Sequence, residues 1–176
     1  MPKLIDDLRN TILQAARRQL LEIGYDKLTM RSVAAECGVA VGTLYNYFSA
    51  KDVLIASTML DDWLRSLQKM QNCMANADDP LDGLRSVYSA ISEFTAVYSP
   101  SWSHAKAQAA AQPFLHNGHR QLLDQLAGAM RPMLARLAPD TPDSFLPYLA
   151  ELILQQAVNG EGGFEALAPV LAKLLS

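Results

Sequence analysis

The sequence predicts an all-α fold in two parts: a three-helix domain containing a helix-turn-helix, followed by a six-helix bundle. Three observations predict this fold class. Apolar residues recur at helical spacing along almost the whole chain, and no stretch alternates as a β-strand would. In addition, three consecutive helix starts near the N-terminal end share one local pattern.

The first helix is expected over residues 4–23, where Gly24 ends it. Its apolar residues fall on one side, which would be buried: Leu8, Ile12, Ala15, Ala16 and Ile23.

The next three helix starts have N-cap positions at Thr29, Ala40 and Ser49. Each N-cap residue is directly preceded by one apolar residue and followed four positions later by another. At this spacing the two apolar side chains pack against each other at the start of the helix, as a hydrophobic staple. The pairs are Leu28 with Val33, Val39 with Leu44, and Phe48 with Val53. This pattern predicts short helices over 30–37 and 41–48 and a long one from 50 to about 74, which is a helix-turn-helix followed by a long helix.

The residues inside this window agree with a helix-turn-helix. Ala34 is small enough for two crossing helices to approach closely, and Gly38 can adopt the left-handed conformation that reverses the chain. Leu44 is expected to point back between the helices. The alternative is an ordinary helical hairpin.

Five further helices complete an expected total of nine. Asp79-Pro80 opens the first of them, because Pro at the first helical position needs no amide partner, and this helix is expected to stop before Pro100. Pro113 closes a short helix, and Pro132 is expected to kink the next one. The expected ranges are 80–98, 103–112, 117–137, 141–159 and 164–175.

The net charge of −3 argues against a general nucleic-acid binder, but its distribution is informative. Residues 1–52 carry seven Lys/Arg and six Asp/Glu, a net charge of +1, and the other 124 residues carry eight Lys/Arg and twelve Asp/Glu, a net charge of −4.

The two cysteines, Cys37 and Cys73, show no metal or redox spacing. No apolar run approaches the ~20 residues of a membrane span, and no signal-peptide segment is present, so a cytoplasmic location without membrane contact is expected.

Residues 12–55, and above all GTLYNYF followed by KD, resemble the TetR family of bacterial transcriptional regulators. The resemblance implies a homodimer whose helix-turn-helix pairs enter successive major grooves of a two-fold operator. It also implies a C-terminal bundle that dimerises and encloses a small effector. The chain departs from many relatives at Ala40-Val41, where they have Ser-Lys or similar polar residues. Without a polar N-cap side chain at Ala40, the helix that follows should be less stable by about 1 kcal/mol. The departure also removes a cation from the end of that helix that would face the groove.

A recognition helix reads base edges with the side chains near its N-terminus. Here these are Val41, Gly42 and Thr43, with Tyr45 and Asn46 one turn later. Val41 suits a thymine methyl group, Asn46 suits adenine, and Thr43 suits a base or a phosphate.

Other predicted DNA contacts flank this helix. The hydroxyls of Tyr45 and Tyr47 can reach phosphates or base edges, and Lys51 and Thr29 are predicted phosphate contacts. Arg31, one turn into the preceding helix, is placed to read guanine. The alternatives are that the two tyrosines pack in the core and that Asn46 and Arg31 are solvated.

The second part of the chain is rich in methionine and aromatic side chains, which suit a pocket for a lipophilic ligand. The predicted pocket wall consists of Trp63, Phe94, Tyr98, Trp102 and His104. The alternative for most of these residues is plain core packing.

The last two helices carry broad apolar stripes: Phe145, Leu146, Leu149, Leu152 and Ile153, then Leu167, Val170, Leu171, Leu174 and Leu175. We expect them to form a four-helix interface with the same two helices of a second, symmetry-related chain, the alternative being burial within one chain.

His116 and His119 have a spacing that can chelate a metal, but no acidic or Cys partner is near, so no metal or cofactor is expected. No nucleophile–base pair, phosphate loop or paired-acid motif indicates an enzyme.

The sequence therefore predicts a DNA-binding domain over residues 1–48 and an effector-binding and dimerisation domain over 49–176. The predicted function is that of a transcriptional repressor released from a palindromic operator by a small apolar ligand. The alternative is a helical ligand-binding or interaction protein that does not bind DNA.

Overall fold

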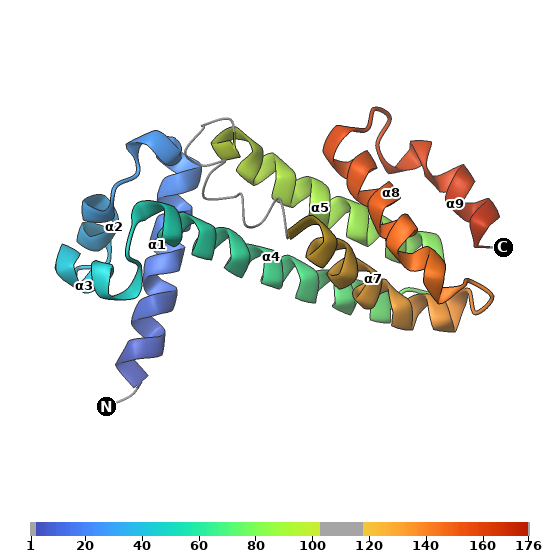
Figure 1. The fold of residues 1–176 in the computed structure, drawn as a ribbon, viewed down its shortest axis with the longest axis horizontal. Coiled ribbons are helices and arrows are strands. Elements are labelled where there is room, and N and C mark those ends of the chain that lie inside the picture. Colours follow the sequence, from blue (N-terminus) through green and yellow to red (C-terminus); the bar gives the residue numbers. More distant parts are fainter. Residues whose placement is uncertain (1–2, 103–117, 176) are drawn as a thin grey trace. The chain divides into compact units, whose positions relative to one another are not determined.

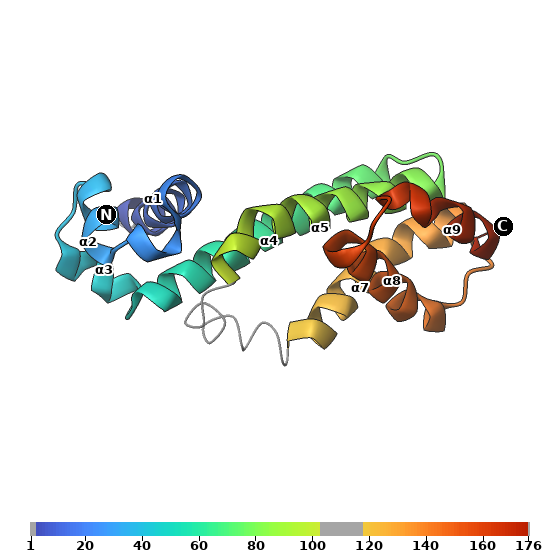
Figure 2. The same cartoon turned by 90° about the horizontal axis from the view of Figure 1, so that it is seen from above.

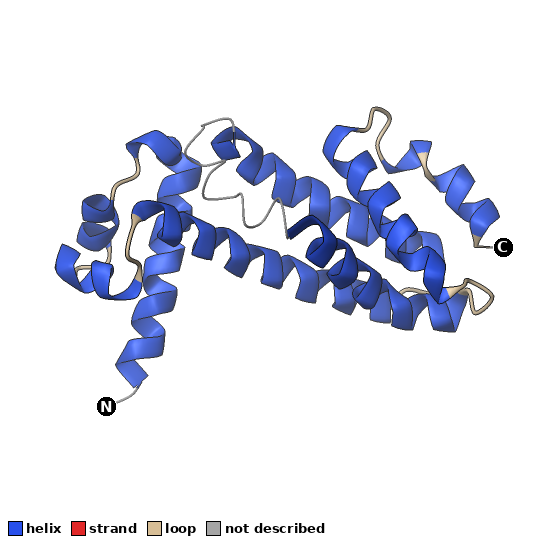
Figure 3. Cartoon of the chain, viewed as in Figure 1, coloured by secondary structure: helices blue, strands red, loops and turns tan. Residues whose placement is uncertain are grey.

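The computed structural model describes residues 3–102 and 118–175, apart from the side chains of residues 3–7 and 100–102. These residues form eight α-helices and two short 3₁₀ turns, with no strand among them (Figure 3). The helices are α1 (Lys3–Lys27), α2 (Met30–Glu36), α3 (Val41–Tyr47), α4 (Lys51–Ala75), α5 (Pro80–Trp102), α7 (Gly118–Leu137), α8 (Leu146–Asn159) and α9 (Ala168–Leu174). The turns are η1 (Asp143–Phe145) and η2 (Phe164–Ala166). The all-α prediction is confirmed, and the helix expected over 103–112 lies outside the described residues.

The chain divides into two compact units. The first takes in Met1–Asp62 and Val97–Gln112, and the second takes in Trp63–Ala96 and Pro113–Ser176. Helices α4 and α5 therefore each contribute to both units.

In the first unit, α2 and α3 pack beside α1 and the start of α4 (Figure 1). The shared core comes from all four helices and includes Ile12, Leu13, Ala16, Val33, Ala34, Leu44, Phe48, Leu54 and Ile55. Ala34 is 2% exposed, as expected for a small residue at a close helix crossing. The prediction for Ile23 was wrong, since its side chain is 42% exposed. The helix is interrupted one residue later, and Tyr25 and Leu28 occupy the core there instead.

Two glycines shape this unit. The left-handed conformation predicted for Gly38 is confirmed, whereas α1 does not end at Gly24 as expected. Gly24, with φ 79° and ψ 170°, interrupts α1, which then continues for one more turn to Lys27. Gly38, with φ 68°, closes α2. There the amide of Val39 donates to the carbonyl of Ala34 (3.0 Å) and that of Gly38 to Ala35 (3.1 Å), the paired pattern of a Schellman motif. Gly38 thus fixes the direction in which α3 leaves α2.

In the second unit, α7 and α8 pack against each other over an apolar cluster to which α4, α5 and α9 also contribute (Figure 2). The Asp79-Pro80 start is confirmed: α5 begins at Pro80, and Asp79 Oδ1 accepts from the amide of Leu81 at 2.8 Å. The predicted end of this helix was wrong, because α5 continues through Pro100 to Trp102. So close to the helix end, a proline removes one hydrogen bond of the final turn without ending the helix.

The last two predicted helices begin differently from expectation. The segment after Thr141-Pro142 opens with the η1 turn before α8, and the segment from Phe164 opens with η2. Helix α9 itself begins only at Ala168, with a proline next to its start. Pro132 lies inside α7, and the kink expected there remains a prediction. No helix in the described ranges is both long and apolar enough to cross a bilayer.

Candidate functional site

Helix α3 presents most of its surface outward. Of its seven residues only Leu44 is buried, at 0% exposure, where it locks the helix onto the core. The predicted base-reading residues Val41, Gly42, Tyr45 and Asn46 are all exposed, and Thr43 is half-buried. A Cβ added at Gly42 would meet nothing within 4 Å, so the backbone there is open to a large partner. Ala40 caps α3 without a side-chain hydrogen bond, as expected for this residue.

Thr29 starts α2 through a capping box. Its Oγ1 accepts from the amide of Ser32 (3.0 Å), and its own amide donates to Ser32 Oγ (3.1 Å). Reciprocal bonds of this kind satisfy two amides that the first turn would otherwise leave unpaired. The Thr29 side chain is exposed beside them.

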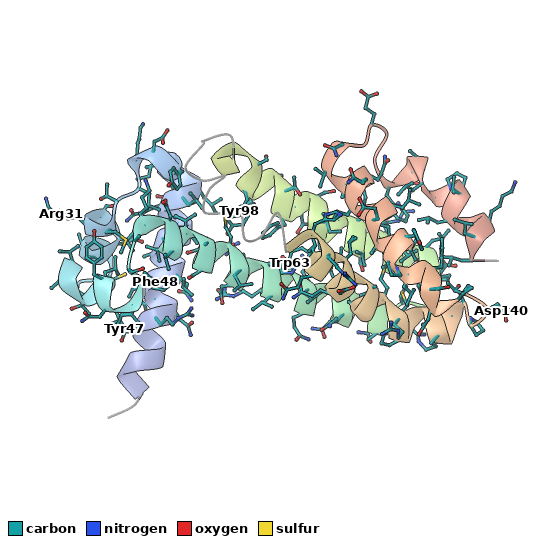
Figure 4. All side chains as sticks on the ribbon, in the orientation of Figure 1. Arg31, Tyr47, Phe48, Trp63, Tyr98 and Asp140 are labelled. Carbon is teal, nitrogen blue, oxygen red and sulfur yellow. The ribbon has the colours of Figure 1, made fainter. Side chains whose placement is uncertain are left out.

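Arg31 is exposed and projects away from α2 (Figure 4). It is the second residue of α2, so the prediction that it lies one turn into the helix was wrong. From this position the long Arg31 side chain can extend to a partner and offer it the N–H donors of the guanidinium.

Lys51 and Tyr47 are less accessible than the other predicted contacts. The Lys51 ammonium lies 4.1 Å from the centroid of the Tyr25 ring and donates to the Tyr25 carbonyl. The Tyr25 hydroxyl in turn donates to Asp52. Burial, followed by this hydrogen bond, raises the pKa of Tyr25 to about 12. Lys51 therefore ties the start of α4 to the end of α1, and its ammonium would have to leave Tyr25 to reach a phosphate. Tyr47 is half-buried.

A polar network that the sequence reasoning missed joins α1 to α2. Arg18 donates to Glu36 Oε1 from Nε (2.9 Å) and Nη2 (2.7 Å), and Gln19 Nε2 donates to Glu36 Oε2 (2.6 Å). The hydrogen bonds from Gln19 and then Arg18 hold the pKa of Glu36 below its usual range. The available signal was Glu36 itself, an acid at the C-terminal end of a short helix, where the helix dipole disfavours it.

Among the predicted effector contacts, the second unit brings Trp63 and Phe94 together. Trp63 is 4% exposed, and its ring meets that of the half-buried Phe94 edge-on, with centroids 5.5 Å apart. Its indole Nε1 donates to Gln125 Oε1 at 2.8 Å. The side-chain amide of Gln125 therefore lies beside the Trp63–Phe94 pair, in a cluster that is otherwise apolar.

Tyr98, another predicted wall residue, belongs to the first unit and is 1% exposed. Its hydroxyl donates to Asp62, whose Oδ2 also lies 2.8 Å from Arg17 Nε. Burial and then this hydrogen bond raise the pKa of Tyr98 far above its usual range. The proton of the Tyr98 hydroxyl is thus already donated to a group of the protein itself. The side chain of Trp102 and all of His104 lie outside the described residues.

The apolar stripes of α8 and the C-terminal segment are largely buried inside the second unit, as Leu149, Ile153 and Leu171 illustrate at 0% exposure. Val170 and Leu174 remain about half exposed, at 50% and 48%. The expectation that no acidic partner lies near was wrong for His119, whose Nε2 pairs with Glu151 at 2.7 Å, while His116 lies outside the described residues. The described ranges contain no group of three or more His, Cys, Asp or Glu side chains that could hold a metal.

Comparison with known proteins agrees with this geometry. The family model for bacterial regulatory proteins of the tetR family matches residues 12–58, which run from α1 into α4. The HTH-type transcriptional regulator UidR of Escherichia coli K12 is 32% identical over 79 residues, which cover 45% of this chain and 37% of UidR. The chain therefore spans little more than a third of the length of this curated relative.

Two further comparisons extend beyond the helix-turn-helix. The HTH-type transcriptional repressor KstR of Rhodococcus jostii is 28% identical over 151 residues, covering 77% of this chain and 66% of KstR. The crystal structure of a TetR-family regulator from Pectobacterium atrosepticum matches 99% of this chain and 97% of its own, with a TM-score of 0.73 at 20% identity. The fold thus agrees over nearly the whole length, and the match to the family model lies over residues 12–58, which contain the helix-turn-helix. Residues 12–58 of this chain thus match the tetR family of bacterial regulatory proteins, and the fold is that of a solved TetR-family regulator.

Proposed function

We propose that this protein is a sequence-specific DNA-binding repressor that acts in the cytoplasm as a homodimer and leaves a palindromic operator when it binds a small apolar molecule. Residues 1–48 form the DNA-binding domain in this proposal, and residues 49–176 bind the effector and dimerise. The observation that carries it is the exposure of α3, which keeps only Leu44 in the core and offers Val41, Gly42, Tyr45 and Asn46 to the outside. A helix presented this way fits the major groove.

The chemistry of the exposed residues supports a division between base and phosphate contacts. Asn46 carries the donor and acceptor that match adenine, and Arg31 carries the fork that matches guanine. Thr29, Thr43, Tyr45 and Tyr47 carry hydroxyls suited to phosphates. Lys51 would act mainly by holding α4 to α1, since its ammonium is engaged with Tyr25.

For the effector, we propose a largely apolar molecule with one hydrogen-bonding group. Trp63 and Phe94 supply aromatic surface, and Gln125 supplies a side-chain amide beside them. Pockets of this kind bind through apolar contact and use a few polar groups to orient the ligand. Phe94 is half-buried and Trp63 is 4% exposed.

For the dimer, we propose contacts through the exposed apolar residues of α8 and α9. These are Tyr148, Val158, Val170 and Leu174, at 72%, 43%, 50% and 48% exposure. The residues already buried in the chain's own core would position these helices. Substituting Val170 and Leu174 together by Glu should give a monomer by sedimentation, and a double variant that remains a dimer would refute this surface.

Selection of bound duplexes from a random pool tests the function as a whole. The proposal expects enrichment of a palindrome whose half-sites are about one helical turn apart, because two-fold symmetric proteins select two-fold symmetric sites. Enrichment of nothing above the starting pool would favour the alternative of a helical ligand-binding or interaction protein that does not bind DNA.

A further inference from the structure

We propose that Gln19 is a positioning residue for DNA recognition, because its side-chain amide attaches α2 to α1 at two points. This inference rests on the proposed function and adds to it a residue that is expected to touch no DNA. The attachment would decide where α2, with Thr29 and Arg31, lies relative to the rest of the domain.

The two attachment points are Ser32 and Glu36. Ser32 Oγ lies 2.6 Å from Gln19 Oε1, and Gln19 Nε2 lies 2.6 Å from Glu36 Oε2. The orientation of the amide is dictated by its partners. An ionised carboxylate can only accept, so the amide nitrogen faces Glu36 and the amide oxygen receives the Ser32 hydroxyl.

The network continues to the start of α2. Ser32 Oγ accepts the amide of Thr29 at 3.1 Å, and its one proton has two acceptors within reach, Gln19 Oε1 at 2.6 Å and the Thr29 carbonyl at 2.8 Å, of which Gln19 is the nearer. A hydroxyl that both accepts and donates is polarised in each role, which strengthens both bonds. The cap of α2 is therefore connected through Ser32 and Gln19 to the Glu36 carboxylate, which Arg18 also binds at 2.7 Å.

Two points of attachment constrain a helix more than one does. Ser32 is the third residue of α2 and Glu36 the last, so they lie one turn apart on the same face. Burial of Met30, Val33 and Ala34 holds α2 against the core, and the ion pair between Arg18 and Glu36 alone would add one fixed point at the end of the helix. With Ser32 also attached to Gln19, both the rotation of α2 and its position along α1 are fixed.

A displacement of α2 would also reach α3. Ala34 is buried at 2% exposure, and the Gly38 turn that follows it fixes the exit of α3 by hydrogen bonds to Ala34 and Ala35. The two helices therefore move as one piece. Because the network lies at the surface, it contributes little to stability, and its main effect is on geometry.

Four variants test this inference against DNA selected by the wild-type chain. Q19M keeps the length of the side chain and removes both hydrogen bonds. Q19E places a second carboxylate opposite Glu36. The double variant Q19E/E36Q exchanges the two groups, so that the Ser32 hydroxyl and the new amide at position 36 can both donate to the new carboxylate at position 19. Q14M is the matched control, because Gln14 is an exposed glutamine of the same helix without a hydrogen bond in the described part of the chain.

Each variant is titrated by fluorescence anisotropy with the selected duplex and with a scrambled duplex at one salt concentration, and its thermal unfolding is recorded. Q19M should lower affinity for the selected duplex about three- to tenfold while affinity for the scrambled duplex stays within about twofold. Q19E should lose at least as much. Q19E/E36Q should recover most of the loss, and Q14M should match the wild type.

The inference is overturned if Q19M and Q19E bind the selected duplex as the wild type does, if both duplexes lose affinity equally, or if the double variant does not recover. Should Q19M fail to fold, the comparison of Q19E with Q19E/E36Q decides alone. A wild-type chain that selects no duplex refutes the proposed function itself, which is a separate outcome from unchanged binding by the Gln19 variants.

Discussion

The hydroxyl of Tyr98 donates to the carboxylate of Asp62, which joins the C-terminal part of α5 to the middle of α4 inside the first unit. Both residues are buried, at 1% and 8% exposure, and Arg17 of α1 completes the arrangement with its Nε 2.8 Å from the same carboxylate. A buried carboxylate is tolerated only when it is paired and hydrogen-bonded. Asp62 meets that condition through residues from two other helices.

Replacing Tyr98 by Phe should therefore destabilise the protein. The ring packing is kept, but Asp62 loses a hydrogen bond in a buried site, which costs about 1–3 kcal/mol of unfolding free energy. Urea unfolding followed by circular dichroism measures the change. Y88F is a suitable control, because Tyr88 packs beside Phe164 and is less buried. An unfolding free energy equal to that of the wild type would show that the hydrogen bond contributes nothing.

Stability should fall at alkaline pH as Tyr25 is forced to ionise. Its pKa is raised from 10.0 to about 12 by burial and by the bond to Asp52, so the folded state holds this proton more tightly than the unfolded state does. The stabilisation is complete below pH 10 and is lost as pH rises towards 12. Tyr98, with its raised pKa, acts in the same direction. Urea unfolding from pH 9 to 12 should show the decline, and Y25F should make it shallower. An identical slope in Y25F would remove Tyr25 as a cause.

Arg31→Ala should weaken binding to the selected operator by about 1–3 kcal/mol and relax preference at one base pair. The loss follows from an exposed guanidinium near the start of α2. Titration with the operator and with single-base variants measures both effects. R120A, at an exposed arginine of the second unit, is the control for loss of one positive charge. If R31A keeps both affinity and base preference, Arg31 does not take part in recognition.

Arg136 should matter for stability more than its exposure suggests. Its Nη2 donates to the carbonyls of Met74 (3.2 Å) and Ala75 (3.3 Å) at the end of α4 and to that of Ala77 (2.8 Å) in the loop that follows. A cation at this position satisfies the last carbonyls and complements the helix dipole. R136A should cost about 1–3 kcal/mol of unfolding free energy. R131A, which breaks only an exposed pair with Asp143, should cost less than about 1 kcal/mol. Equal losses for the two would contradict the cap.

The features that sequence predicted best are those set by neighbouring residues. The Thr29 cap, the left-handed Gly38 and the burial of Leu44 each follow from spacing within a few positions, and the structure has all three. The start of α5 at Pro80 is of the same kind.

The features that sequence missed depend on contacts between distant segments. Nothing local indicates that the Lys51 ammonium lies over Tyr25 or that Gln19 reaches both Ser32 and Glu36. The exposure of Ile23 has the same origin, because helical spacing places it on the buried face while the chain turn at Gly24 brings Tyr25 into the core.

In the proposed function, α3 reads a defined DNA sequence. Its most direct test is the affinity of the full chain for the selected palindrome relative to a scrambled duplex of the same length, measured at about 150 mM salt. Binding to the palindrome should be at least about 1000-fold tighter, with one dimer per duplex and loss of the preference in N46A. Equal affinity for the two duplexes, with binding that disappears as salt is raised, would contradict it.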